Sequence, residues 1–284
     1  MFAITGATGQ LGRLVIEALT KTVSADRIVA AVRTPAKAAD LAARGVVVRE
    51  ADYDRPETLA AAFAGVEKLL LISSNEIGRR VAQHQAAIDA ARAAGVGFVA
   101  YTSVLRAPAS ELGLAEEHRQ TEAALGASGL PHALLRNGWY TENYLASVPA
   151  ALANGAVFGA AGEGRIAGAA RADYAEAAAA VLTRDDQAGV VWELAGAPNW
   201  TLADFAAELS RQTGRTIPYR DLSEADYAAA LLQAGLPEPV ARLLADSDAA
   251  AAKGALDGHG DDLRRLIGRP STPLADSVAQ ALKG

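Results

Sequence analysis

Three glycines near the N-terminus have the spacing of a phosphate-binding turn. Gly6, Gly9 and Gly12 lie between a short apolar segment, residues 2–5, and a segment with apolar side chains at helical spacing, residues 11–19. The first glycine permits a tight turn, the second lets a diphosphate approach the backbone, and the third lets the helix pack closely on the strand. Free N–H groups at the start of that helix favour an anion. We therefore predict that a dinucleotide diphosphate is bound by Gly6, Ala7, Thr8, Gly9, Gln10 and Leu11.

A cation follows the second predicted strand, residues 28–32. Arg33 stands where proteins that bind NAD carry a carboxylate for the ribose 2′-hydroxyl. A guanidinium suits a 2′-phosphate instead, and Lys37 adds a second charge nearby. We therefore expect NADPH as the cofactor and weaker binding of NADH. A solvated position in a loop is the alternative role for Arg33.

Polar residues also follow the third, fourth and fifth predicted strands, residues 46–48, 69–72 and 98–102. Ligands of open α/β sheets bind beyond the carboxyl ends of the strands, so we expect these residues to line the dinucleotide. The residue after the third strand is expected to accept a hydrogen bond from the adenine amino group, and those after the fifth to lie beside the nicotinamide. In chain order, the predicted contacts are Asp52, Ser73, Ser74, Asn75, Thr102 and Ser103.

The segment after the sixth predicted strand, residues 132–136, combines amides, phenols and an indole. Such a mixture is suited to a pocket wall for a flat ring above the nicotinamide. Packing between two lobes of the chain is the alternative. The predicted contacts in this segment are Asn137, Gly138, Trp139, Tyr140, Thr141 and Glu142.

The usual acid of short-chain dehydrogenases is missing. None of the seven tyrosines has a lysine four positions later, and no lysine occurs between Lys68 and Lys253. That lysine would lower the pKa of the tyrosine phenol for proton transfer. A quinone needs less acid catalysis than a ketone, because its reduced anion is aromatic and better stabilised. The absence fits a quinone reductase, and it also fits a protein that binds the cofactor without chemistry.

Two side chains remain as candidates for a proton donor. His118 lies on a predicted helix that leads to Glu122, and Tyr140 belongs to the aromatic segment after the sixth strand. An imidazole or a phenol near the acceptor can donate to a reduced product. A place on the helix surface or in the core is the alternative for His118.

The elements that must position these residues alternate between strands and helices. Each of the first five strands is followed by a helical segment, which predicts a parallel sheet with right-handed crossovers. The strands are continuous apolar runs, as expected when helices cover both faces. We therefore predict a doubly wound α/β fold with Rossmann topology. The first four helices are expected at residues 11–19, 37–44, 57–64 and 81–94.

The second half of the chain is less regular. We expect a seventh strand at residues 190–194 and helices at 202–212 and 225–234. Residues 1–150 are predicted to form the NADP-binding domain, rejoined by about 172–196. Residues 151–284 are predicted to form a smaller α/β lobe over the carboxyl ends of the strands.

Composition excludes several classes of protein. The 284 residues include no cysteine, so disulfides, thiolate metal sites and cysteine nucleophiles are absent, and we expect no metal. The net charge of −6, without a basic run, argues against nucleic acid. No apolar stretch approaches the roughly 18 residues of a membrane span, and the first predicted strand leaves no room for a leader. We expect a cytoplasmic monomer or homodimer.

Four segments resemble the NmrA-like atypical short-chain dehydrogenase/reductases, and among them the bacterial type-two NAD(P)H:quinone oxidoreductases. They are residues 4–12, 69–74, 135–144 and 171–174, and the similarity extends along essentially the whole chain. The resemblance implies NADPH-dependent reduction of quinones by direct hydride transfer, without flavin or metal. It implies cofactor contacts at residues 6–11, 73–75 and 137–142, at Arg33 and at Arg171.

Other members of the family leave two alternatives open. Triphenylmethane dye reductases resemble the chain at the glycine turn but carry a different residue where Trp139 stands, so Trp139 favours a quinone. NmrA-like redox sensors bind NADP without turnover and regulate a partner protein. Because those sensors also lack a catalytic acid, the missing lysine does not distinguish them from the enzymes.

Overall fold

The computed structural model describes residues 1–283 and contains one seven-stranded parallel sheet. The strand order is β3-β2-β1-β4-β5-β6-β8, and every neighbouring pair is parallel. The doubly wound α/β fold is therefore confirmed. The strands are β1 (Phe2–Thr5), β2 (Ile28–Val32), β3 (Val47–Glu50), β4 (Lys68–Leu71), β5 (Phe98–Val104), β6 (His132–Asn137) and β8 (Val191–Leu194).

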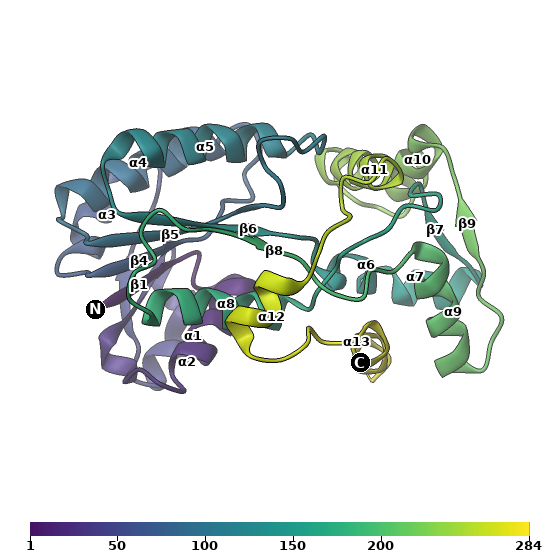
Figure 1. The fold of residues 1–284 in the computed structure, drawn as a ribbon, viewed down its shortest axis with the longest axis horizontal. Coiled ribbons are helices and arrows are strands. Elements are labelled where there is room, and N and C mark those ends of the chain that lie inside the picture. Colours follow the sequence, from purple (N-terminus) through teal and green to yellow (C-terminus); the bar gives the residue numbers. More distant parts are fainter. Residues whose placement is uncertain (284) are drawn as a thin grey trace.

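Helices cover both faces of the sheet (Figure 1). Side chains alternate between the faces of a strand, so Leu69 and Leu71 pack into one apolar core and Leu70 into the other. This explains why the strands are apolar without alternation. One face is covered by α1 (Gln10–Leu19), α2 (Ala39–Ala43), α8 (Arg171–Thr183) and α12 (Asp261–Ile267). The other is covered by α3 (Pro56–Phe63), α4 (Arg80–Ala93) and α5 (Ala115–Ser128).

The direction of winding reverses beside β1. The chain runs outward from β1 through β2 to β3, and then returns to place β4 on the other side of β1. The loops that follow β1 and β4 therefore leave in opposite directions. Such a switch point opens a crevice at the carboxyl ends of the strands. The glycine turn begins at this crevice, directly after β1.

A smaller lobe lies beyond the carboxyl ends of the strands (Figure 1). Its two short parallel strands pair with each other, and its own apolar core contains Trp200 and Phe205. The elements of the lobe are α6 (Thr141–Leu145), α7 (Val148–Asn154), β7 (Val157–Gly159), α9 (Leu202–Thr213), β9 (Tyr219–Asp221), α10 (Glu224–Gln233), α11 (Glu238–Ala252) and α13 (Leu274–Ala281).

Some elements differ from the sequence-based expectations. The helix expected at residues 37–44 is split into a 3-10 turn, Pro35–Ala38, and the short α2, because the backbone of Ala38 leaves helical geometry. A second 3-10 turn, Ala25–Arg27, precedes β2. Several short elements were not predicted. They are α6, α7, β7, β9, α13, and α12, which returns to pack on α8 and β8. Their sequences are short, and contacts distant in the chain define them.

Candidate active site

A cavity of about 760 Å³ lies at the carboxyl edge of the sheet, where the smaller lobe meets it. Its wall is formed by the loops after the first six strands, together with residues of α4, α5 and α11. Most of the predicted site residues meet here. Those that line the cavity are Gly6, Thr8, Gly9, Gln10, Leu11, Arg33, Asp52, Ser73, Ser74, Asn75, Ser103, His118, Asn137, Gly138, Trp139, Tyr140 and Arg171.

Four predicted contacts lie behind the wall instead. Ala7 is fully buried beneath α1, and Thr141 is buried where its N–H donates to the Ala169 carbonyl. The Thr102 hydroxyl accepts a hydrogen bond from the Ser73 N–H at 2.8 Å. The Glu142 carboxylate accepts one from the Arg171 backbone N–H at 2.8 Å. These side chains are engaged by the protein, so they shape the wall rather than present groups to a ligand.

The glycine turn brings the backbone as close as a phosphate site requires. Gly6 has φ +58°, a conformation that favours glycine, and its carbonyl accepts a hydrogen bond from the Gly9 N–H at 2.8 Å. A Cβ at Gly12 would lie 2.4 Å from the Gly6 oxygen. Gly9 caps α1 without a side-chain hydrogen bond, so the N–H groups of the first turn are free for an anion.

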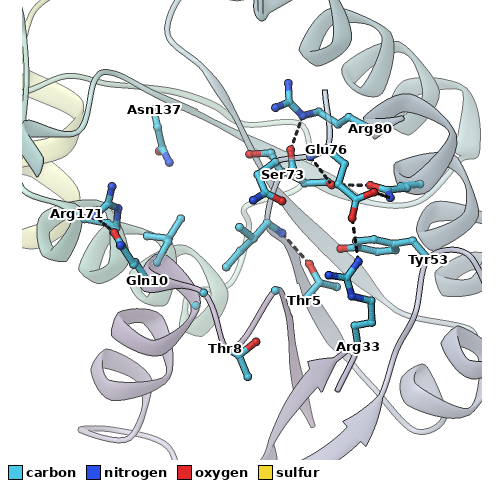
Figure 2. A pocket seen from close by; sticks show the side chains of 18 of the residues that line it. Thr5, Thr8, Gln10, Arg33, Tyr53, Ser73, Glu76, Arg80, Asn137 and Arg171 are labelled. Carbon is cyan, nitrogen blue, oxygen red and sulfur yellow. Dashed lines mark hydrogen bonds and ion pairs between the residues drawn. The ribbon is translucent and has the colours of Figure 1, made fainter. Parts of the chain in front are cut away.

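The Arg33 side chain lies at one end of the cavity (Figure 2). Its guanidinium is 2.9 Å from a carboxylate oxygen of Glu76, and two thirds of the side chain is exposed. Lys37 and Thr34 line the same end. Arg33, Thr34 and Lys37 have the positive charge and the hydrogen-bond donors that suit a phosphate. The Glu76 carboxylate would compete with that phosphate for the Arg33 guanidinium.

Three enclosed polar atoms without a hydrogen-bond partner belong to cavity residues, and one of them, Arg80 Nη1, is 3.2 Å from the Glu117 carboxylate. The other two are the Tyr53 hydroxyl and Asn137 Oδ1, whose side chains lie on opposite sides of the view in Figure 2. Burial raises the pKa of Tyr53 to about 12, so its phenol stays neutral. A buried polar atom without a partner is costly. A ligand that carries polar groups along its length, as a dinucleotide does, would supply both partners.

Arg171 borders the end of the cavity opposite Arg33 (Figure 2). Its guanidinium donates to the Gln10 side chain and lies 4.7 Å from the ring centre of Tyr140. Its backbone N–H donates to the Glu142 carboxylate at 2.8 Å. The glycine turn and the aromatic segment after β6 are thereby tied together, although more than 120 residues separate them in the chain.

The two candidate proton donors sit in different surroundings. Burial raises the pKa of Tyr140, and no lysine stands beside it to oppose that change. His118 Nδ1 lies 2.8 Å from the Tyr101 hydroxyl, and burial, with the charge of Arg80, lowers the pKa of the imidazole to about 3. Both groups are therefore neutral at ordinary pH.

Several cavity residues were missed from the sequence. Glu76, Arg80 and Gln83 follow Ser73–Asn75 within ten positions, and their proximity to a predicted contact is the signal that was available. Leu114 and Leu243 add an apolar wall from the loop before α5 and from α11. No local pattern marks those two leucines, because only the tertiary structure brings them to the site.

Within residues 1–283, no three His, Asp or Glu side chains are grouped as metal ligands would be. Among the helices of the same residues, none combines the length and apolar character that a bilayer crossing needs.

The fold and the cavity together define the doubly wound class of dinucleotide-binding proteins. A family model described as NAD(P)H-binding matches residues 6–185, and the chain belongs to this family.

Comparison with known proteins identifies relatives that match along the whole chain. Quinone oxidoreductase 2 of Escherichia coli (strain K12) is 58% identical over 98% of both chains. A crystal structure of the NADPH-dependent quinone oxidoreductase from that organism, complexed with NADPH, matches with a TM-score of 0.97 over 99% of this chain and 100% of the other. The predicted resemblance is confirmed.

More distant relatives show the breadth of the group. Triphenylmethane reductase of Citrobacter sp., complexed with NADP(H), is 40% identical, with a TM-score of 0.95 over 99% of this chain and 100% of the other. An NmrA-like family domain-containing oxidoreductase of Aspergillus flavus is 27% identical over 99% of this chain and 94% of its own. The predicted NmrA-like relationship is also confirmed.

Proposed function

We propose that this protein reduces quinones with NADPH, by hydride transfer and without a flavin or a metal. The observation that carries the proposal is one continuous cavity. It joins a glycine turn and a cationic cluster suited to a 2′-phosphorylated dinucleotide to an aromatic and apolar wall suited to a flat acceptor. The 58% identity to an E. coli quinone oxidoreductase supports the same acceptor.

When bound, NADPH supplies a hydride, and the protein holds the cofactor and the acceptor in position for its transfer. The free N–H groups of residues 10–12, in the first turn of α1, would hold the diphosphate, and Arg33 would pair with the 2′-phosphate. Asn137 Oδ1, which lacks a protein partner, accepts a hydrogen bond from the carboxamide. Ser73, Ser74, Asn75 and Asp52 line the sugars and the adenine.

The acceptor binds against the indole of Trp139. Trp139 is nearly buried and belongs to the apolar core that continues into the smaller lobe. Leu114 and Leu243 complete the wall and exclude water from the reacting groups. A flat ring stacks well on such a surface, which is why we favour a quinone.

The boundary expected from the sequence is residue 150. Because α6 and α7 belong to the smaller lobe, residues 1–140, with about 172–196, are proposed as the cofactor-binding unit, and most of the remainder as the lobe that covers the substrate. A cytoplasmic location, the absence of a nucleic-acid partner and a monomeric or homodimeric state stay predictions from the sequence.

One assay tests the proposed function. Purified protein is mixed with NADPH and a simple benzoquinone, and the loss of absorbance of the reduced nicotinamide is followed. We expect turnover well above the uncatalysed rate, unchanged after dialysis against a chelator and without a flavin spectrum in the protein. A rate equal to the background would reject the enzyme and favour a sensor that binds NADPH without turnover.

A cationic dye is the second candidate acceptor, because a triphenylmethane reductase shares 40% identity and the same fold. The dye is tested in the same cuvette by its loss of colour. We expect a higher kcat/KM for the quinone, since the chain is 58% identical to a quinone oxidoreductase and 40% identical to the dye reductase. The reverse order would make the dye class the better description of the acceptor.

A further inference from the structure

His118 on α5 has one ring nitrogen engaged and the other free. Nδ1 is 2.8 Å from the Tyr101 hydroxyl. Nε2 has no hydrogen-bond partner in residues 1–283, and the side-chain atoms there that are both enclosed and unpaired belong to other residues. Because His118 lines the cavity and its Nδ1 is engaged by Tyr101, Nε2 is the ring nitrogen available to a ligand.

Tyr101 determines which nitrogen of His118 carries the proton. The tyrosine is fully buried, its hydroxyl lies 2.8 Å from His118 Nδ1, and the Thr121 hydroxyl is a second polar neighbour. A buried phenol donates its proton whenever an acceptor is present, since an unused donor is costly. Nδ1 therefore accepts, and the single proton of the neutral ring is on Nε2.

The neighbouring histidine leaves this assignment intact. His84 Nε2 accepts a hydrogen bond from the Ser74 N–H at 2.9 Å, so its proton is on Nδ1, which faces the Thr121 hydroxyl at 2.9 Å. Thr121 in turn donates to the Glu117 carbonyl at 2.9 Å. The Thr121 proton is thus committed to that carbonyl, and the Tyr101 hydroxyl has His118 Nδ1 as an acceptor within hydrogen-bond distance, at 2.8 Å.

The charged groups around the ring keep it neutral. Burial and then the charge of Arg80 lower the pKa of His118 to about 3, and burial raises the pKa of Tyr101 above its ordinary value. Arg80 is 3.2 Å from Glu117, and the Glu122 carboxylate pairs with Arg136 at 2.7 Å. Both carboxylates have cationic partners, so neither draws a second proton to the imidazole.

We propose that His118 donates a hydrogen bond through Nε2–H to the acceptor oxygen that gains negative charge, and that Tyr101 is the positioning residue that fixes this donor. The inference rests on the proposed function and assigns the donor that the missing Tyr–Lys pair would otherwise supply. Hydrogen-bond donors that are already fixed in a site with little water stabilise developing charge effectively, because they need not reorient during the reaction.

The chemistry balances without an acid on the protein. NADPH, when bound, would supply a hydride and be oxidised to NADP⁺. The hydride, with its two electrons, would form an O–H bond at one quinone oxygen, and the negative charge would fall on the other oxygen. The product is a hydroquinone monoanion with one charged oxygen. The His118 N–H hydrogen bonds to that oxygen and keeps its own proton, and water then supplies the proton that completes the hydroquinone.

The first test reads the proton on the ring directly. Protein labelled with ¹⁵N in its four histidines is studied by long-range ¹H–¹⁵N correlation, and His118→Gln identifies the His118 signals by their loss. We expect Nε2–H at neutral pH, and a mixture of tautomers in Tyr101→Phe, which loses only the hydroxyl. A wild-type ring that is charged, or protonated on Nδ1, would overturn the proposal whatever the activity.

The second test uses amides as substitutes for the two nitrogens. His118→Leu should lower kcat about 100-fold with NADPH affinity unchanged, as for other lost donors of this kind. His118→Gln places an N–H near Nε2 and should recover kcat to within about tenfold of wild type, whereas His118→Asn reaches only the Nδ1 position and should not. Tyr101→Phe should lower kcat about tenfold. Tyr227→Phe, a buried phenol of the smaller lobe, is the matched control and should leave kcat unchanged.

Two kinetic outcomes separate the hypotheses. An active wild type with an unchanged kcat in His118→Leu overturns the donor role alone. An inactive wild type overturns the proposed function, and the His118 hydrogen bond to a quinone oxygen then has no reaction to serve. The wild-type kcat should also show no inflection near the ordinary histidine pKa of about 6.5, because the ring stays neutral.

Discussion

At the scale of single residues, the cation proposed to select the cofactor, Arg33, is already paired. Arg33 bonds to Glu76, and Glu76 also accepts hydrogen bonds from Arg79 and Gln83 at 3.0 and 2.9 Å. The carboxylate therefore stays in place by its other contacts when the guanidinium turns to a ligand. Affinity for a 2′-phosphate is the difference between the attraction of Arg33 and the repulsion of Glu76.

Arg33→Ala should weaken NADPH about tenfold, the value of one charge-assisted contact at an exposed site, and leave NADH nearly unchanged. Only NADPH carries the phosphate that Arg33 would pair with. Calorimetry with both coenzymes measures the effect. Arg27→Ala removes an exposed cation at the other end of β2 and is the matched control. Equal weakening of both coenzymes would assign Arg33 a structural role.

Glu76→Gln should strengthen NADPH binding by a factor of up to about five, because exposed pairs contribute about 1 kcal/mol or less. The amide keeps the shape of the side chain and removes its charge, so NADH should bind as before. The same calorimetric titration tests this, with Glu50→Gln as a control for net charge. Glu50 is exposed, pairs with Arg55 and does not line the cavity. Weaker NADPH binding in Glu76→Gln would mean that Glu76 holds Arg33 in position.

At the scale of elements, the turn and α1 act together. Gly12 lets the first turn of α1 lie against the backbone of Gly6 and Ala7. A Cβ on residue 12 would be 2.4 Å from the Gly6 oxygen and 2.7 Å from the Ala7 Cα. Both neighbours are backbone atoms and have little freedom to move. Glycine at residue 12 therefore lets the N-terminus of the helix lie where it would meet the proposed diphosphate.

Gly12→Ala should lower the free energy of unfolding by about 1–3 kcal/mol, the cost of overpacking, and weaken both coenzymes. Denaturant unfolding and calorimetry give the two values. Gly126→Ala, in α5, is the control, because no atom lies within 4 Å of its added methyl group. That change should raise the free energy of unfolding by about 0.5–1 kcal/mol through helix propensity. Unimpaired coenzyme binding in Gly12→Ala would argue against the phosphate role of the turn.

At the scale of the whole molecule, a buried carboxyl joins three parts of the smaller lobe. Asp248 on α11 accepts hydrogen bonds from the Tyr144 hydroxyl at 2.9 Å and from the Ala160 N–H at 3.0 Å. Burial raises the pKa of Asp248 from 3.8 to about 6, even though these donors oppose the change. The lobe that closes the cavity is therefore held partly by a group that prefers to be protonated.

The contribution of Asp248 to stability should depend on pH. Its folded pKa is raised, so the contribution is fully present below about pH 4 and is lost as pH rises through about 6. The difference in free energy of unfolding between wild type and Asp248→Asn should fall by about 3 kcal/mol over that window. Urea titrations at several pH values measure it, with the exposed Asp185→Asn as control. A difference independent of pH would contradict the raised pKa.

Local patterns in the sequence predicted the sheet and one end of the site. Apolar runs and glycines report on the nearest few residues, so the strands, the turn at Gly6–Gly12 and the cation Arg33 could be predicted from the chain alone. The aromatic segment around Trp139 was predicted from its composition and from a family resemblance. The places where strands end were less certain: β5 continues to Val104, two residues beyond its predicted end.

The tertiary structure alone decided which groups meet. Leu243 reaches the cavity from more than 200 residues beyond the glycine turn, α12 returns to the sheet, and Tyr101 meets His118 across an element boundary. Such contacts depend on how the helices pack on the sheet and on which acceptor each buried donor can reach. Local spacing in the sequence does not determine either of these, because core packing and buried hydrogen bonds join residues far apart in the chain.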